Sequence, residues 1–143
     1  MTHPQSPTSA PAGMVRLPIA DSVTAAIARL EAAISAHGLR LFARIDFAAD
    51  AAAVGLPMPP ALLFLVGQPR AGTPLMIAAP TVALDLPLKL LVYEDHSGAS
   101  WVGYNSPEYL GERHGVPQNL LPNVAGAGVL AAIAAGTAPP RTG

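Results

Sequence analysis

The spacing of apolar residues along the chain predicts one long helix and several strands. Between residues 23 and 34, large apolar side chains recur every three or four positions, which places them on one face of a helix. Asp21 before this segment is a suitable N-cap, and Gly38 after it a suitable end. From residue 39 to 46, apolar residues occupy every second position, the pattern of a half-buried strand. Further strands are expected at residues 14–19, 62–66, 88–94 and 100–104, the last two joined as a hairpin.

Two shorter helices are predicted from their capping residues. Asp46 is placed to cap a short alanine-rich helix that ends near Gly55. Residues 67–72 read as a glycine-containing loop. After this loop, Thr73 and Pro74 provide an N-cap and a first-turn proline for a helix that the next proline ends.

The remaining elements settle the expected fold class. A serine–proline pair starts a helix that ends at Gly115, and a final helix is predicted over residues 121–135. Helices interleaved with an antiparallel hairpin predict an α+β domain with a mixed, largely antiparallel sheet of about five strands and helices packed on one face. This single domain is expected over residues 13–137, with flexible proline-containing tails at residues 1–12 and 138–143.

The chain has more apolar residues than the core of a small domain can bury. Of the 143 residues, 51% are hydrophobic and only 12% are charged, and the mean hydropathy is +0.40. A typical globular chain has about 25% charged residues. No charge occurs at residues 51–69, 71–84 or 115–140. The middle helices and the last helix are therefore the predicted surfaces for a second copy of the chain.

Charge and cysteine content exclude several classes of function. Eight basic and nine acidic residues give a net charge of −1, too few cations for a nucleic-acid-binding face. The chain has no cysteine, which excludes disulfides, iron–sulfur clusters and thiolate zinc sites. The N-terminal residues lack the pattern of a signal peptide, and prolines or polar residues interrupt the uncharged stretches before the ~20 residues that a membrane span needs. We therefore expect a cytoplasmic protein that binds neither nucleic acid nor membrane.

Residues 67–73 are the first candidate for a binding site. They lie between an apolar strand and a predicted helix, where amides at a helix start can hold an anion. Thr73 follows Gly72 where a nucleotide-binding P-loop requires lysine, so a nucleotide site is disfavoured. Arg70 and the amides from Thr73 onward are instead suited to one small anion or carboxylate. The alternative is a tight turn in which Arg70 faces water.

Polar residues at the ends of other predicted strands and turns complete a candidate ring around an apolar pocket. Besides Arg70, Gly72 and Thr73, they are Arg44, Asp46, Asp85, Tyr104 and Asn105. Asp46 and Asp85, together with Glu94, are the acids placed for acid–base catalysis, although cap and turn roles explain the first two. No metal-ligand spacing and no serine elbow is present, so the sequence assigns no metal, no catalytic residue and no cofactor.

Four blocks of sequence resemble one known family. They are residues 42–46 (FARID), 67–76 (GQPRAGTPLM), 84–89 (LDLPLK) and 102–110 (VGYNSPEYL), the last followed by Arg113 and His114. From about residue 14 to residue 114, this order resembles the domain of unknown function 302 family. The resemblance implies a small α+β domain of the TATA-binding-protein-like group, commonly a homodimer, with no established activity and no catalytic residues to transfer. Phe47 and Gln68 depart from the family pattern, which often has histidine and asparagine there.

Together these observations favour a homodimeric module that binds a small ligand or anion, without established catalysis. A hydrolase or isomerase that uses Asp46, Asp85 or Glu94 is the alternative, and it requires two of these carboxylates in one pocket. A structural module that binds another protein is the third hypothesis, expected if the fold has no pocket.

Overall fold

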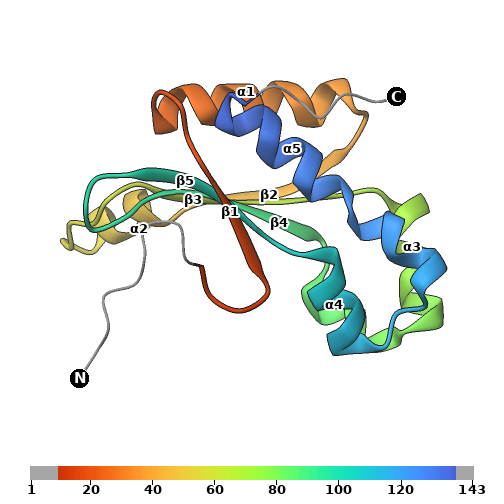
Figure 1. Cartoon of the computed structure of the whole chain (residues 1–143). Helices are drawn as coiled ribbons and strands as arrows, with labels where there is room; N and C mark the ends of the chain where they lie inside the picture. The colour runs from red at the N-terminus through yellow and green to blue at the C-terminus, as the bar shows by residue number, and fades with distance from the viewer. Residues whose placement is uncertain (1–9, 138–143) are drawn as a thin grey trace.

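In a computed structural model, which describes residues 10–137, the chain forms a five-stranded sheet covered by helices (Figure 1). The strand order is β1-β5-β4-β3-β2. The strands are β1 (Met14–Pro18), β2 (Arg40–Asp46), β3 (Ala61–Gly67), β4 (Leu88–Glu94) and β5 (Ser100–Asn105). The predicted α+β class is confirmed, and every strand pair is antiparallel rather than mixed. The predicted tail residues 1–9 and 138–143 lie outside the described residues.

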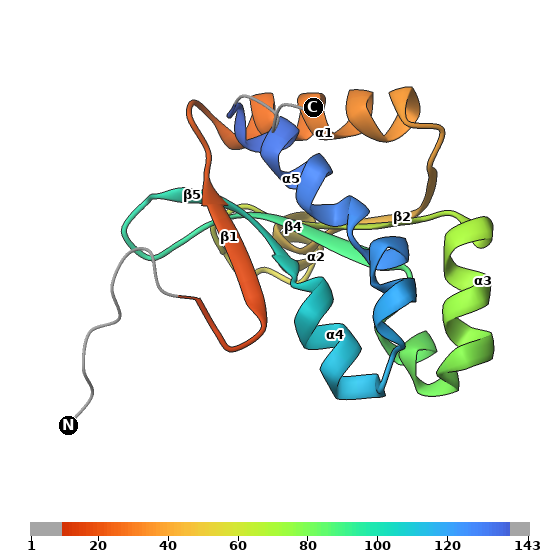
Figure 2. The ribbon, with the colours of Figure 1, turned by 45° about the vertical axis from the view of Figure 1, so that its right-hand side comes forward.

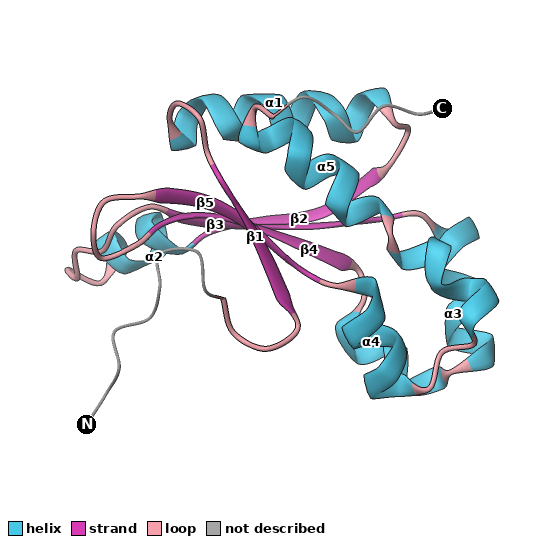
Figure 3. Ribbon diagram, in the orientation of Figure 1, coloured by secondary structure: helices cyan, strands magenta, loops and turns pink. Residues whose placement is uncertain are grey.

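The helices divide between one face of the sheet and its two ends. They are α1 (Val23–Ala36), α2 (Phe47–Ala53), α3 (Pro69–Ala78), α4 (Pro107–His114) and α5 (Gly126–Ala135), with 3₁₀ helices η1 (Pro80–Asp85) and η2 (Gln118–Val124). Figure 3 shows α1 and α5 together on one face. Because α2 precedes β3 and α3 follows it, these two helices lie at opposite ends of the sheet, and α3, α4, η1 and η2 gather at the same end (Figure 2).

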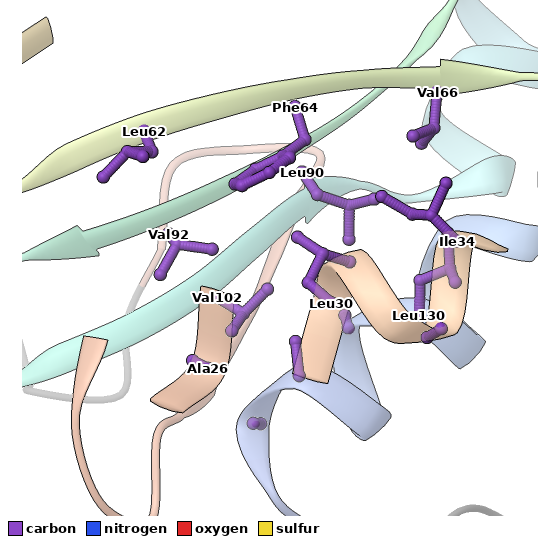
Figure 4. Packing of buried hydrophobic residues seen from close by; sticks show 14 residues of the cluster. Ala26, Leu30, Ile34, Leu62, Phe64, Val66, Leu90, Val92, Val102 and Leu130 are labelled. Carbon is purple, nitrogen blue, oxygen red and sulfur yellow. The ribbon is translucent and has the colours of Figure 1, made fainter. Parts of the chain in front are cut away.

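The core lies between the sheet and the pair α1–α5. Alternate residues of β3, namely Leu62, Phe64 and Val66, are buried, as expected from the apolar run in this strand (Figure 4). Leu30 from α1 and Leu130 from α5 belong to the same buried cluster. Each large side chain that is fully buried contributes about 1.5–3 kcal/mol, so this layer is the main source of stability.

The start of α1 differs from the prediction by one residue. Ser22, not Asp21, is the N-cap, and its hydroxyl accepts a hydrogen bond from the Ala25 amide at 3.1 Å. Asp21 instead forms an ion pair with Arg29 at 2.7 Å, which holds the carboxylate away from the cap position. This pairing keeps the pKa of Asp21 far below its ordinary value, first through the hydrogen bond from Arg29.

Strand β2 is more exposed than its alternating pattern predicts. It lies at the edge of the sheet and pairs only with β3. A register shift between Leu41 and Ala43 interrupts that pairing, and the side chains of Leu41 and Phe42 are exposed. The prediction of a half-buried strand is wrong for this part of β2, because the irregular pairing between Leu41 and Ala43 interrupts the regular alternation of side chains.

The uncharged C-terminal helix is covered within the protomer. By length and composition alone, Gln118–Ala135 is the one stretch among the described residues that is long and apolar enough to cross a membrane. The predicted single helix is instead divided into η2 and α5. Leu130 and Ala131 of α5 are buried in the core with α1. We conclude that α5 is a core helix, and that its apolar character does not require a second subunit.

Candidate functional site

A cleft of about 560 Å³ opens at the end of the sheet where β3 leads into α3. Helix α3 and the segment η2 lie side by side at this end (Figure 2). Helices α3 and α5, the 3₁₀ helices η1 and η2 and the strands β2, β3 and β4 contribute to its walls. The apolar lining residues include Phe42, Val66, Leu75, Met76, Leu86 and Leu130. A volume of this size falls within the usual range for small-molecule sites, about 300–1,000 Å³.

The first turn of α3 determines which residues face this cleft. The predicted loop over residues 67–72 and helix start at Thr73 are wrong, because α3 begins at Pro69 with Gln68 at the N-cap. Proline is well suited to this position, since its missing N–H would have no acceptor within the helix. Pro74 lies inside the helix, where it removes one backbone hydrogen bond. The amides from Thr73 onward are therefore inside a helix rather than at its start.

The polar groups of the cleft are uncharged. Gln68, Thr73 and Asn123 line it, and no Asp, Glu, Lys, Arg or His is among the described residues that do. The side-chain amide of Asn123 donates a hydrogen bond to the Ala71 carbonyl at 3.0 Å, which joins η2 to α3 across the cleft. The side chain of Gln68 makes no capping hydrogen bond to α3. This arrangement suits a largely apolar ligand that is oriented by one or two neutral polar groups.

A second group of polar side chains connects η1 to α4. Asp85 Oδ2 accepts hydrogen bonds from Arg113 Nη1 at 2.8 Å and from His114 Nε2 at 2.5 Å. The other ring nitrogen of His114, Nδ1, lies 2.9 Å from the hydroxyl of Thr81. Burial acts to raise the pKa of Asp85, but the hydrogen bond from His114 and the charge of Arg113 outweigh it, so that this pKa lies below its ordinary value. The Asp85 carboxylate is therefore ionised at neutral pH.

The structure brings two of the eight residues proposed from the sequence into the cleft. Gly72 and Thr73 line it from α3. Arg70, although also on α3, is exposed and is not among the lining residues. Asp85 belongs to the group on η1 and α4 described above.

The other proposed residues have structural partners elsewhere. Arg44 pairs with Glu31 at 3.3 Å on the surface, and Asp46 caps α2 by accepting from the Ala49 amide at 2.9 Å, as predicted. Tyr104 on β5 packs against α5, where burial raises the pKa of its hydroxyl, with a smaller effect of the Glu108 charge. Asn105 pairs with Met14 at the end of β5.

The acids proposed for catalysis do not converge among the contacts of the described residues. Asp46 caps α2, whereas Asp85 is held by Arg113 and His114 at the other end of the sheet. Glu94 ends β4 opposite Ser100. In the part of the chain that the structure describes, no three His, Cys, Asp or Glu side chains gather to hold a metal ion.

Sequence reasoning missed the far walls of the cleft and the partners of Asp85. Leu86 and Asn123 lie outside α3, and an apolar or amide residue alone does not identify a wall. Arg113 and His114 lie in the last turn of α4, where basic side chains are common for a local reason, so their sequence position does not indicate a partner on η1. The signal for their second role was their presence, with Asp85, among the blocks that carry the family resemblance.

Comparison with known proteins identifies relatives in sequence and in structure. The sequence profile of the family described as "Domain of unknown function DUF302" matches residues 15–133. The crystal structure of an uncharacterized conserved protein DUF302 from Bacillus stearothermophilus has a TM-score of 0.71 to this chain at 19% identity, covering 88% of this chain and 98% of that one.

Two curated relatives carry the name of a membrane protein. They are fluoride-specific ion channel FluC 1 of Brucella suis biovar 1 and fluoride-specific ion channel FluC 2 of Brucella melitensis biotype 1. Each is 39% identical to this chain over 102 residues, or 71% of the chain. These residues make up 40% and 38% of the two relatives, so this chain spans about two fifths of their length.

Proposed function

The chain belongs to the DUF302 family, and we propose that it acts as a binding module for a small uncharged ligand held in the cleft between β3 and α3. The observation that carries this proposal is the apolar cleft of about 560 Å³ with neutral polar groups at its wall. The proposal assigns binding, and no catalysis, to this cleft.

The lining favours an apolar ligand over the anion expected from the sequence. Arg70 does not line the cleft, and the amides from Thr73 onward lie inside α3, so neither donor considered for an anion is offered to a ligand there. An anion would lose its hydration in the cleft without gaining a charged partner there, which is unfavourable. An uncharged ring or acyl chain would instead gain contacts with Leu75, Met76 and Leu86.

Titration with Nile red, an uncharged dye that fluoresces in apolar surroundings, tests this proposal. We expect saturable binding with one dye per protomer, and we expect Gly72→Leu to abolish it by filling the cleft. Thr24→Leu, on the exposed side of α1, is the matched control and should leave binding unchanged. Inorganic phosphate is the comparator. A rise in melting temperature with phosphate that Arg70→Ala abolishes, without saturable dye binding, would contradict the proposal in favour of an anion site.

The assembly that we propose is a homodimer formed through the exposed apolar residues around α2. The α2 patch consists of Phe47, Val54, Leu56 and Met58, and the exposed fractions of Val54 and Leu56 are 73% and 62%. Its sequence lies largely in the uncharged stretch 51–69. A group of large exposed apolar side chains is typical of protein interfaces. The patch lies at the opposite end of the sheet from α3, so a dimer formed there leaves the cleft open.

Light scattering coupled to size-exclusion chromatography tests the dimer. We expect the mass of two chains at high micromolar concentration and a monomer for Leu56→Asp. Ile77→Asp is the control, because Ile77 is even more exposed than Leu56, at 77%, but lies on α3. A monomeric wild-type chain, or a dimer that only Ile77→Asp dissociates, would contradict this assembly.

The channel relatives suggest a second candidate function, that of a domain that works beside a membrane channel in the cytoplasm. A channel needs helices of ~20 apolar residues that cross the membrane. Within residues 10–137 the one stretch of that character is Gln118–Ala135, and its second half, α5, packs in the core. The matched region covers two fifths of the relatives, so the membrane spans would belong to the remainder. Co-purification in detergent with a fluoride channel, absent for an unrelated channel, is the result expected. Equal recovery with both channels would remove this candidate.

A further inference from the structure

The polar side chains that connect η1 to α4 include an exposed hydroxyl, that of Thr81, which does not line the cleft. Thr81 is exposed, whereas the side chains of His114 and Asp85 have exposed fractions of 4% and 15%. Hydrogen bonds connect the three in a row, from the Thr81 hydroxyl to His114 Nδ1 and from His114 Nε2 to Asp85 Oδ2. None of the three lines the cleft.

The partners of the imidazole determine where its protons lie. An ionised carboxylate only accepts hydrogen bonds, so the Nε2 atom of His114 must donate to Asp85. In a neutral imidazole the other nitrogen, Nδ1, then has no proton and accepts. With the imidazole neutral, the Thr81 hydroxyl is therefore the donor to Nδ1. This is the protonation pattern of a hydroxyl with a general base beside it.

We propose that Thr81 is a nucleophile that His114 activates for acyl transfer from carboxylic esters with a small apolar acyl group. Asp85 holds the imidazole in place and is itself held by Arg113, so Asp85 is a positioning residue. Residues three apart lie on the same face of a 3₁₀ helix, which places Leu84 beside Thr81 on η1. Leu84 is 71% exposed and offers an apolar contact for the acyl group.

The reaction balances without any further reactant than water. Thr81 Oγ1 forms a bond to the acyl carbon, and its proton passes to Nδ1 of His114. The bond from the acyl carbon to the ester oxygen breaks, and the leaving alcohol takes the proton from His114. Water then attacks the acyl-threonine in the same way, releasing the carboxylic acid and restoring the Thr81 hydroxyl. Compared with serine proteases of the chymotrypsin type, the two ring nitrogens exchange roles, but the order hydroxyl, imidazole, carboxylate is the same.

Reaction with para-nitrophenyl acetate tests this inference on the full chain. Release of para-nitrophenolate measures acylation, and mass spectrometry of peptides locates the acetyl group. We expect acetylation of Thr81, retention of the reaction in Thr81→Ser, and its loss in Thr81→Val. Thr24→Val, a change of another exposed threonine that has no histidine contact among the hydrogen bonds of the described residues, is the matched control and should react like the wild type.

Variants of the histidine and the carboxylate separate catalysis from packing. General base catalysis is worth about 100-fold or more, so His114→Asn should lower the acetylation rate of Thr81 by at least about 100-fold. Asp85→Glu should keep more of the rate than Asp85→Asn, although asparagine is closer to aspartate in size. Thermal unfolding of each variant shows that it is folded. Acetylation of Thr81 at the rate of Thr24, or a rate in folded His114→Asn equal to wild type, would overturn the inference. The cleft proposal would be unaffected by this result.

Discussion

Replacement of Gly72 by alanine should separate the stability of the domain from its ability to bind in the cleft. Gly72 lies inside α3 with ordinary helical backbone angles and lines the cleft. An added Cβ would lie 3.8 Å from Leu86 Cδ1 and 4.0 Å from Met76 Cε, which are ordinary van der Waals distances. The methyl group therefore enters the cleft without a clash.

The two expected effects have opposite signs. Alanine in a helix interior is favoured over glycine by about 0.4–1 kcal/mol, so Gly72→Ala should be more stable than the wild type. For a domain of this size, this corresponds to a rise in melting temperature of roughly 2–4 °C. A methyl group that takes space from a fitted ligand costs about 1–3 kcal/mol, so Nile red should bind at least about tenfold more weakly.

Circular dichroism and dye fluorescence measure the two effects on the same protein. Ser35→Ala is the control, because Ser35 is an exposed position of α1 that does not line the cleft, and it should gain stability without a change in dye affinity. Unchanged dye affinity in Gly72→Ala would refute the assignment of the dye to this cleft. A lower melting temperature would refute the packing described around Gly72.

Three further predictions concern stability. Phe64→Ala removes a fully buried ring from the centre of β3 and should lower the free energy of unfolding in urea by about 3–5 kcal/mol; a loss below 1 kcal/mol, on the order of a surface change, would contradict the core described. Gly115 ends α4 with a φ of +68°, a conformation that alanine adopts only with strain. Gly115→Ala should therefore lower the free energy of unfolding by about 1 kcal/mol in the same experiment, although its Cβ would meet no atom within 4 Å. An unchanged free energy of unfolding would mean that the backbone relaxes. The hydrogen bond from Trp101, and after it the one from Ser97, lowers the pKa of Asp95 from 3.8 to about 2. The ionised Asp95 therefore stabilises the fold fully above pH 3.8, and this stabilisation is lost as the pH falls towards 2. Asp95→Asn should therefore show a weaker loss of stability over this range than wild type, and an equal loss would show that other carboxylates dominate.

Most elements could be predicted because local patterns and long-range packing agree in them. The apolar run of β3 is buried, Asp46 caps α2, and the hairpin of β4 and β5 closes where Asp95 accepts amide hydrogen bonds from Ser97 and Ala99. In α3 two local signals compete. Thr73 followed by Pro74 has the stronger helix-start signature, yet Pro69 also fits a first turn, and the helix of the structure starts at Pro69.

The candidate site could be predicted only where its residues are close in sequence. Gly72 and Thr73 lie on the helix that follows β3, and their place shortly after this strand in the sequence identified them. Asp85 and His114 are 29 residues apart, and only the fold brings their side chains together. The same holds for Asn123, whose contact with α3 spans 52 residues.

The most direct test of the cleft as the binding site is the change in amide chemical shifts of the isotopically labelled protein on titration with Nile red. The account predicts that the shifts of Gly67, Gly72 and Asn123, which lie on three walls of the cleft, change together and saturate. Changes confined to the residues around Val54 and Leu56 would contradict it, because they would place the dye on the α2 patch.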